Sequence, residues 1–273
     1  MPKSVYFLFF LLFGLFESIA VANDLDVKKS QWNGFERLDF KYKGVKSLLV
    51  IPDSPAKGFP WVWRARFFGH QPQADIELLK RGFHLAYCDV AGLFGNQVAV
   101  ERWNEFYQML ITQRGLSKKP ALEGMSRGGL IIYNWASENP EKVSCIYGDA
   151  PVCDIRSWPG GKGKGKGGGS AWKAALKAHR ITDEESKSAK VSPIHKLKPI
   201  ADAGIPILHV VGAADKVVPV DENSEIIEKK YKELGGNIHV ISKPGIGHHP
   251  HALKDPRPIV DFILKHSLKI KVD

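Results

Sequence analysis

The chain has 273 residues, of which 44% are hydrophobic, and it carries a net charge of +10. This length and composition provide for one sizeable hydrophobic core and leave little room for a second catalytic domain. An excess of positive charge favours contact with acidic polymers or surfaces, although it is often only a solvated face. We therefore expect a single domain with a modest preference for anionic substrates.

The first 22 residues have the features of a signal peptide. An apolar run extends from Val5 to Phe16, and the Ala-Val-Ala sequence at 20–22 fits a signal-peptidase site. The run is shorter than the roughly 20 residues of a membrane span, which argues against the alternative of an uncleaved anchor. We predict cleavage after Ala22, a secreted or periplasmic protein of residues 23–273, and no stable membrane insertion after cleavage.

Segments typical of strands and helices alternate along the rest of the chain, which predicts an α/β fold with a mostly parallel sheet covered on both faces. The expected strands are an antiparallel hairpin at 35–44 and 45–52, then 60–67, 83–90, 120–126, 143–152, 205–215 and 237–245. The expected helices are 73–82, 99–115, 128–140 and a last helix that Asp255 and Pro256 introduce.

Residues 155–197 interrupt this alternation, because they contain a Gly/Lys-rich tract and no strand pattern. We interpret them as a cap-like insertion over an edge of the sheet. Glycines at 163, 165 and 168 also fit a GxGxxG nucleotide-binding pattern, and 160–166 is similar to a phosphate loop. Gly167 replaces the required Ser or Thr, however, and no strand precedes the tract, so we expect no cofactor.

Three cysteines, Cys88, Cys145 and Cys153, are present, and none belongs to a CxxC zinc pattern. Cys88 and Cys145 fall in expected buried strands, where a free thiol behaves as a small hydrophobic group. A disulfide between Cys145 and Cys153 stays open at this point.

A serine lies between two glycines in the sequence Gly124-Met125-Ser126-Arg127-Gly128, between an expected strand and an expected helix. A nucleophile on such a turn projects from the end of the strand, and glycines two positions away on either side avoid collisions with neighbouring elements. Arg127 begins the helix, so its backbone N–H has no partner inside the helix and can stabilise an oxyanion. The pattern predicts that Ser126 is a nucleophile.

A serine nucleophile needs a general base and an acid that orients the base. Asp215 follows an apolar strand and a turn of small residues, and it is our candidate for the acid. Asp149 and Asp154, which follow the preceding strand, are weaker alternatives.

For the base, three histidines follow the last expected strand. His248 comes directly after a Gly-Ile-Gly turn and is our candidate, with His249 second, because an error of one residue would exchange them, and His251 third. A metal cluster of the three is a further alternative. Their spacings around a proline do not match familiar zinc motifs, so we predict no metal.

This order of motifs resembles the α/β-hydrolase superfamily, especially its secreted single-domain members that are prolyl-oligopeptidase-like or carbohydrate-esterase-like. The resemblance covers nearly all of residues 23–273, and it implies a sheet of about eight strands and a triad of Ser126, His248 and Asp215. The superfamily commonly has His-Gly-Gly after the third strand as a second oxyanion donor, whereas residues 63–67 read Trp-Arg-Ala-Arg-Phe. We expect the backbone N–H of Arg64 or Ala65 to take this role.

The triad predicts an enzyme that transfers acyl groups through a covalent intermediate, and we expect a carboxylic ester hydrolase. Arg64 and Arg66 with Trp63 suggest a carbohydrate-linked or anionic ester, since guanidinium groups bind carboxylates and indole rings stack on sugars. Both arginines could instead be surface charges. We expect a small-molecule or carbohydrate ester as substrate and no nucleic acid as partner. The alternatives are a prolyl-oligopeptidase-like peptidase and a noncatalytic binding protein, and the oligomeric state is left open.

Overall fold

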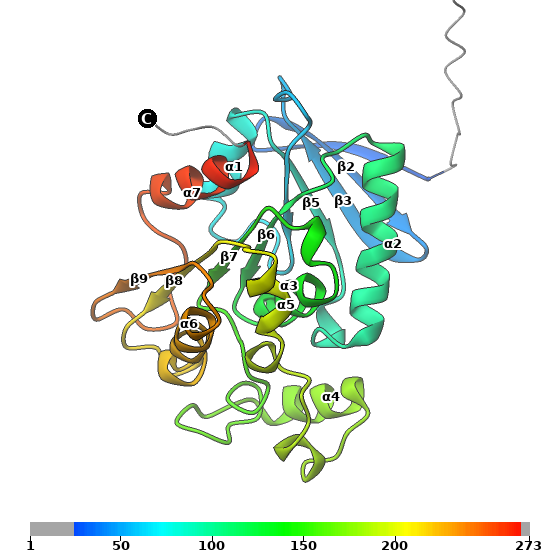
Figure 1. Ribbon diagram of the computed structural model, residues 1–273. Helices are drawn as coiled ribbons and strands as arrows, with labels where there is room; N and C mark the ends of the chain where they lie inside the picture. The colour runs from blue at the N-terminus through cyan, green and yellow to red at the C-terminus, as the bar shows by residue number, and fades with distance from the viewer. Residues whose placement is uncertain (1–24, 269–273) are drawn as a thin grey trace, which may run out of the picture.

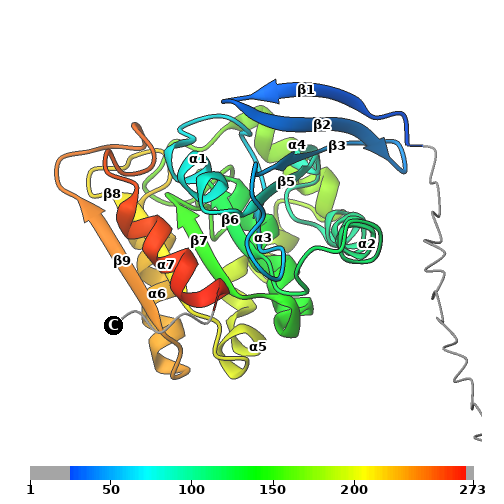
Figure 2. The ribbon, with the colours of Figure 1, turned by 90° about the horizontal axis from the view of Figure 1, so that it is seen from above.

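The computed structural model describes residues 25–268, which form a nine-stranded sheet with helices on both faces (Figures 1 and 2). The strand order across the sheet is β1-β2-β3-β5-β4-β6-β7-β8-β9. The strands are β1 Lys28–Trp32, β2 Phe35–Tyr42, β3 Val45–Ile51, β4 Trp61–Arg64, β5 His84–Cys88, β6 Ala121–Met125, β7 Cys145–Asp149, β8 Ile207–Gly212 and β9 Ile238–Lys243. The signal peptide predicted over residues 1–22 lies outside the described residues.

The sheet is antiparallel at one end and parallel through the rest. β1, β2 and β3 pair antiparallel with one another in sequence, and β3 also pairs antiparallel with β5. All pairs from β5 to β9 are parallel. The predicted mostly parallel α/β sheet is confirmed, and β1, which precedes the predicted hairpin, raises the number of strands from about eight to nine.

The helices divide between the two faces of the sheet. They are α1 Gln73–Lys80, α2 Gln97–Gln113, α3 Gly128–Glu138, α4 Gly169–His179, α5 Leu197–Asp202, α6 Ser224–Glu233 and α7 Arg257–Ser267. α1 and α7 pack together on one face, and α2, α3, α5 and α6 cover the other. Among residues 25–268, no helix has both the length and the apolar character needed to cross a bilayer.

Strand β4 shows how the two faces are filled. Trp61 and Trp63 belong to the core under α2 and α3, whereas Val62 belongs to the core under α1 and α7, because successive side chains of a strand point to opposite faces. Trp63 stacks on Trp103 of α2 with ring centroids 3.9 Å apart. Burial on both faces explains why the central strands read as continuous apolar runs.

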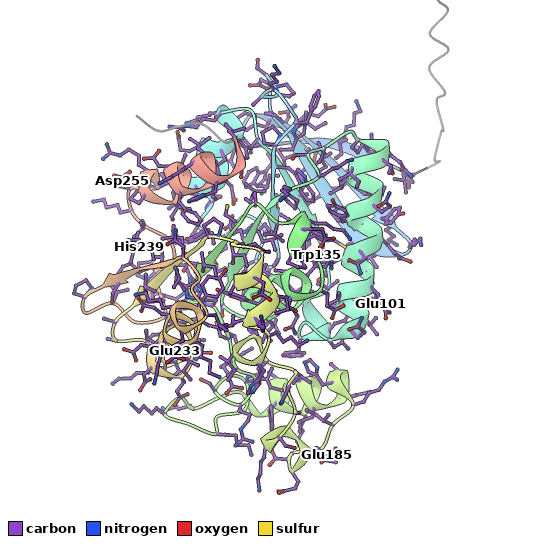
Figure 3. The ribbon with its side chains drawn as sticks, viewed as in Figure 1. Glu101, Trp135, Glu185, Glu233, His239 and Asp255 are labelled. Carbon is purple, nitrogen blue, oxygen red and sulfur yellow. The ribbon has the colours of Figure 1, made fainter. Side chains whose placement is uncertain are left out.

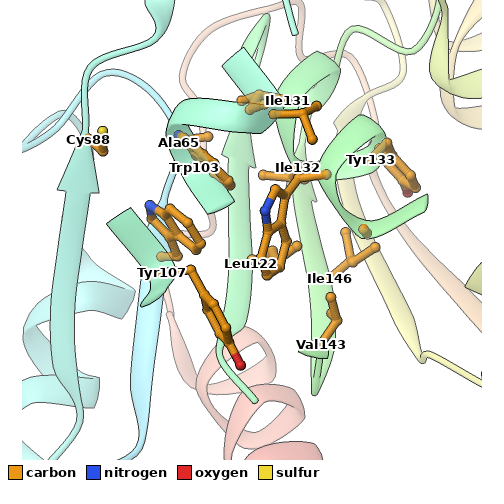
Figure 4. Packing of buried hydrophobic residues seen from close by; sticks show 14 of the residues in the cluster. Ala65, Cys88, Trp103, Tyr107, Leu122, Ile131, Ile132, Tyr133, Val143 and Ile146 are labelled. Carbon is orange, nitrogen blue, oxygen red and sulfur yellow. The ribbon is translucent and has the colours of Figure 1, made fainter. Parts of the chain in front are cut away.

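The larger core lies between the sheet and the helices α2 and α3 (Figure 4). There, Trp103 and Tyr107 of α2 belong to the same buried cluster as Ile132 of α3 and Leu122 of β6. Trp135 of α3 faces this interior, in contrast to exposed residues such as Glu101 (Figure 3). This packing holds β6 and α3, which flank the serine turn, in a fixed relation to each other.

The insertion at 155–197 contains α4 and packs on the fold through a separate hydrophobic cluster, at the bottom of Figure 1. Trp172 of α4 is buried in this cluster together with Phe94 and Leu130. Within the Gly/Lys tract, Lys164 forms an ion pair with Asp221. The tract is thereby attached to the loop that follows β8.

The three cysteines are buried free thiols. The Cys145–Cys153 disulfide left open by the sequence is therefore not formed. Burial raises the pKa of Cys88 and of Cys145 to about 12, which keeps both thiols protonated and unreactive at neutral pH.

Candidate active site

Ser126 lies on a tight turn between β6, which ends at Met125, and α3, which begins at Gly128. Its φ is +49°, a left-handed conformation that is uncommon for a residue with a side chain. Hydrogen bonds hold the turn: the N–H of Ser126 donates to the carbonyl of Asp149 (2.8 Å), and the N–H groups of Gly129 and Val152 donate to the carbonyl of Ser126 (2.9 and 2.8 Å). Backbone strain held in this way is typical of functional sites.

The glycines on either side of Ser126 allow this close packing. A Cβ at Gly124 would lie 2.5 Å from Cδ1 of Ile132 and 2.9 Å from the carbonyl oxygen of Gly128. A Cβ at Gly128 would lie 3.3 Å from Cβ of Arg66, in the loop after β4. The first position therefore excludes a side chain, and the second brings the loop after β4 against the start of α3.

The structure brings together the side chains of Ser126, His248 and Asp215 from three separate loops. Asp215 follows β8 and His248 follows β9, and the parallel arrangement places both loops at the same edge of the sheet as the end of β6. Oγ of Ser126 lies 3.1 Å from Nε2 of His248, and Nδ1 of His248 lies 2.6 Å from Oδ2 of Asp215. This chain of hydrogen bonds joins a hydroxyl, an imidazole and a carboxylate.

The environment of Asp215 keeps its carboxylate charged. Its Oδ1 accepts hydrogen bonds from the N–H groups of Val217 (2.8 Å) and Val218 (2.9 Å), while Oδ2 faces His248. Burial by itself would raise the pKa of Asp215, but the hydrogen bonds from His248 and from the two N–H groups outweigh it and lower the pKa below its ordinary value. A fixed negative charge therefore lies behind the imidazole of His248.

The other two histidines of the same loop take different positions. His249 is exposed beside His248, with ring centroids 5.1 Å apart. His251 is buried, and its Nδ1 lies 2.8 Å from Oδ1 of Asp149. Ligand nitrogens of His248, His249 and His251 all lie within 4.8 Å of one another, so these three residues form the candidate metal-binding group of residues 25–268. Neither His249 nor His251 is hydrogen-bonded to Ser126.

Asp149, one of the weaker alternatives for the acid, anchors this loop instead. Its carboxylate accepts hydrogen bonds from His251, from the N–H of Ala252 (2.5 Å) and from the hydroxyl of Tyr147 (2.7 Å). The hydrogen bonds from His251 and Ala252 attach the histidine loop to the end of β7, and the one from Tyr147, within β7, holds the carboxylate in place.

A cavity of about 440 Å³ opens beside Ser126. It is lined by Phe67, Phe68, His70, Met125, Ser126, His248, His249 and His251. No residue of the insertion at 155–197 and no carboxylate belongs to this lining. The lining therefore combines the apolar side chains of Phe67, Phe68 and Met125 with four imidazoles and the hydroxyl of Ser126.

The backbone N–H of Arg127 fits the position expected of an oxyanion donor. It immediately follows Ser126 and makes no hydrogen bond to any residue between 25 and 268. The expected second donor is wrong, because the N–H of Ala65 donates to the carbonyl of Glu123 (2.9 Å) and Arg64 is part of β4, which is paired on both sides. Phe67, two residues further on, lines the cavity and has a φ of +52°.

Arg64 and Trp63 do not contact substrate from the positions they occupy. Both are 0% exposed. The guanidinium of Arg64 pairs with Asp75 and lies 3.1 Å from Glu123, and Trp63 stacks within the core. The predicted substrate-binding role of these two residues is wrong, because β4 is a central strand with helices on both faces.

Arg66 is the third residue of that prediction, and it is half-buried. Its guanidinium lies over the ring of Phe67, 4.8 Å from the centroid, and it lines a neighbouring cavity with Arg37 and Tyr87. Arg66 is not part of the lining of the serine cavity.

Sequence reasoning missed the residues that shape the cavity. Phe67, Phe68 and His70 are in the loop directly after β4, next to the residues that the sequence pattern favours, Trp63 to Arg66. The two consecutive aromatic residues followed by Gly69 were the available signal, since a loop at the carboxyl end of a parallel strand faces the site.

No family model and no curated protein has a significant match to this sequence. Among solved structures, the chain is similar to a puromycin hydrolase (TM-score 0.64, 17% identity, covering 90% of this chain and 40% of that chain). It is also similar to dipeptidyl peptidase 4 of Porphyromonas gingivalis (TM-score 0.66, 13% identity, 86% and 36%) and to an acylaminoacyl peptidase of Pyrococcus horikoshii (TM-score 0.64, 12% identity, 92% and 42%).

These likenesses show the fold, and the α/β-hydrolase fold predicted from the motifs is confirmed. The chain spans about two fifths of the length of the solved structures it matches.

Proposed function

We propose that this protein is a serine hydrolase that cleaves acyl bonds through an acyl-enzyme intermediate. The observation that carries the proposal is the chain of hydrogen bonds from Oγ of Ser126 to Nε2 of His248 (3.1 Å) and from Nδ1 of His248 to Asp215 (2.6 Å). A strained turn presents the hydroxyl, and an apolar cavity lies beside it. Similarity of fold to proteins named as hydrolases and peptidases supports the same conclusion.

Each residue of the triad has a defined role in this mechanism. His248 accepts the proton of Ser126 while Oγ attacks the carbonyl carbon, and it then donates that proton to the leaving group. Water attacks the acyl-enzyme in the second half, with His248 again as base, and Ser126 is released. Asp215 fixes the tautomer of His248 and stabilises the imidazolium as it forms.

The oxyanion of the tetrahedral intermediate is stabilised by the backbone N–H of Arg127. This group lies at the start of α3, where it has no partner in the helix. We assign the second donor to the N–H of Phe67, which replaces the expected Arg64 or Ala65. Phe67 shares the cavity with Ser126, and its N–H makes no hydrogen bond to the backbone of residues 25–268.

We further propose an ester of an uncharged acyl group as the preferred substrate. Phe67, Phe68 and Met125 offer apolar surface for the acyl group. The lining contains no carboxylate that would bind the free amino group of a peptide, which disfavours an aminopeptidase. The expectation of a sugar or anionic group loses its basis with Arg64 and Trp63, which are buried.

A peptidase is the second candidate, because two of the three similar structures described above are named as peptidases. The two candidates separate by rates on methyl acetate and methyl butyrate, whose alcohol is not activated, against the p-nitroanilides of alanine and N-acetylalanine. We expect kcat/KM to be highest for the esters and higher for N-acetylalanine than for alanine p-nitroanilide. Cleavage of alanine p-nitroanilide that is faster than cleavage of the esters would overturn the ester preference and leave the serine mechanism in place.

The control for this assay is a pair of serine variants on neighbouring elements. Ser126→Ala is expected to abolish turnover of every substrate. Ser137→Ala, on α3, removes a hydroxyl that bonds to the carbonyl of Asn134 (2.8 Å) and is expected to retain turnover. Activity that survives Ser126→Ala would contradict the proposed function itself.

We propose export of the mature protein, supported by the apolar run and the Ala-Val-Ala sequence before residue 23. N-terminal sequencing of protein recovered from the periplasm or the medium is expected to begin at Asn23. Recovery only from the cytoplasm with an intact N-terminus would contradict the proposal.

A further inference from the structure

His248 and His251 each have one ring nitrogen held by a carboxylate, as histidine ligands of metal ions commonly have. Nδ1 of His248 faces Asp215 (2.6 Å) and Nδ1 of His251 faces Asp149 (2.8 Å), so each ring has its Nε2 as the remaining ligand atom. In protein metal sites, a ligating histidine almost always donates its other ring N–H to a carboxylate or carbonyl, which fixes the ring. Both carboxylates are buried and held by further hydrogen bonds.

The third histidine completes the group from the solvent side. His249 is exposed, and its ring centroid lies 5.1 Å from that of His248 and 4.8 Å from that of His251. Ligand atoms of the three residues lie within 4.8 Å of one another. Around a tetrahedral zinc ion with Zn–N bonds of about 2.0–2.1 Å, ligand nitrogens are roughly 3.4 Å apart. Metal binding therefore requires the exposed ring of His249 to rotate toward the other two rings.

We propose that His248, His249 and His251 form a binding site for Zn²⁺ or a similar divalent transition metal, and that the bound metal inhibits the hydrolase. Imidazole nitrogen is a preferred ligand of zinc, copper and nickel, whereas magnesium and calcium prefer oxygen. Three protein ligands leave a fourth position for water.

Inhibition follows from the double use of one nitrogen atom. Nε2 of His248 lies 3.1 Å from Oγ of Ser126, where the proposed mechanism requires a free lone pair to accept the serine proton. A metal ion on the same lone pair leaves His248 unable to act as a base. The metal and the reaction therefore exclude each other.

Metal binding and inhibition are measured separately, because only the inhibition rests on the proposed function. We would titrate the chelator-treated mature chain with ZnCl₂ by calorimetry and by competition with a chromogenic chelator. We expect one Zn²⁺ per chain with a dissociation constant in the micromolar range or below, and no binding of Mg²⁺. Absence of zinc binding would overturn the site whether or not the protein hydrolyses esters.

The variants assign the ligands. His249→Ala and His251→Ala are each expected to weaken zinc binding at least tenfold, whereas His239→Ala, which removes an exposed histidine of β9, is expected to leave it unchanged. Ser126→Ala is expected to bind zinc although it is inactive. Unchanged binding in His249→Ala, or loss of binding in His239→Ala, would overturn the assignment.

The inhibition is measured on p-nitrophenyl acetate. Zinc is expected to abolish turnover with a midpoint that matches its dissociation constant, and EDTA is expected to restore the rate. For His249→Ala, each rate is expressed relative to the metal-free rate of the same variant. The zinc concentration at half inhibition is expected to rise at least tenfold. Stoichiometric zinc binding with undiminished turnover would contradict the placement of the metal on His248.

Discussion

Two aspartate–histidine pairs lie side by side at the carboxyl edge of the sheet, and only one of them reaches the serine. His248 pairs with Asp215 and His251 pairs with Asp149, at 2.6 and 2.8 Å, and the two imidazole rings have centroids 4.7 Å apart. All four residues are buried. The pairs differ in what the second ring nitrogen faces, since Nε2 of His248 alone lies within hydrogen-bond distance of Ser126.

The comparison shows that a buried acid–histidine pair does not by itself define a catalytic site. Asp149 also accepts hydrogen bonds from Tyr147 and from the N–H of Ala252, so its pair with His251 holds the loop in place. Asp215 accepts N–H groups of its own loop and faces His248. Asp149 holds the loop in position, and Asp215 orients the imidazole of His248 beside the nucleophile.

The largest effect is expected from removal of the hydroxyl that distinguishes the two pairs. Ser126→Ala should lower kcat by roughly six orders of magnitude, as in other serine triads in which the nucleophile is removed. The thermal midpoint of unfolding should change little, since the side chain has one hydrogen bond, to His248. Kinetics on p-nitrophenyl acetate and a thermal melt measure the two quantities. A loss of less than a hundredfold would show that Ser126 is not the nucleophile.

The next largest effect is expected from Asp215→Asn. The two N–H groups on Oδ1 keep the amide oxygen in place and turn its NH₂ group toward Nδ1 of His248. Nε2 then carries the ring proton and cannot accept one from Ser126, so kcat should fall by about four orders of magnitude. Steady-state kinetics measure the change, and Asp154→Asn, another aspartate near the carboxyl edge, is the control. A loss of kcat below tenfold in Asp215→Asn would show that the pair of Asp215 and His248 is not required for catalysis.

Asp149→Asn tests the other pair and should act mainly on stability. Its Oδ2 accepts from Tyr147 and from the N–H of Ala252, so the amide oxygen takes that position and the NH₂ group faces Nδ1 of His251, which has to change its tautomer to accept. The negative charge that strengthens all three hydrogen bonds is lost. We expect the free energy of unfolding to fall by about 2–3 kcal/mol, and kcat to fall by no more than about tenfold. Urea unfolding and kinetics on the folded protein measure these changes. A loss of kcat as large as that of Asp215→Asn would show that both aspartate–histidine pairs are required for catalysis.

A third buried histidine sharpens the comparison through pH. His209 on β8 is hydrogen-bonded to the hydroxyls of Tyr133 (2.6 Å) and Ser224 (2.9 Å), and burial lowers its pKa to about 3. Between pH 6.5 and 3, His209 binds a proton in the unfolded chain but not in the folded protein. The free energy of unfolding therefore has its full value, as far as His209 is concerned, above pH 6.5 and decreases as the pH falls below it. From pH 7 to 5 this loss is about 2 kcal/mol.

Urea unfolding at pH 7, 6 and 5 measures that loss. The slope of the unfolding free energy against pH should be smaller in His209→Gln than in the parent protein, by about the amount above. The comparison uses slopes, so any constant loss of stability in the variant cancels. Equal slopes would mean that His209 is protonated to the same extent in both states.

Much of the fold and the serine turn could be predicted because they depend on local patterns. Glycines two residues before and after Ser126 avoid steric collisions with Ile132 and with the loop after β4. Any strand–turn–helix of this kind brings such groups close to the turn. The order of Ser126, Asp215 and His248 along the chain follows from loops that leave successive parallel strands at one edge.

The surroundings of the triad could not be predicted in the same way. Arg64 and Trp63 are charged and aromatic residues near the end of a strand, which made them candidates for substrate contact. The spatial order places β4 between β5 and β6, so both side chains point into packed layers, where Arg64 meets Asp75 and Glu123. That environment comes from residues distant in sequence. The pairing of His251 with Asp149, 102 residues away, has the same origin.

Reaction with a fluorophosphonate probe, followed by peptide mapping, tests the central claim most directly. The account predicts one labelled residue, Ser126, with labelling abolished in His248→Ala and retained in His251→Ala. Labelling of another residue, or labelling of Ser126 at the parent rate in His248→Ala, would contradict it.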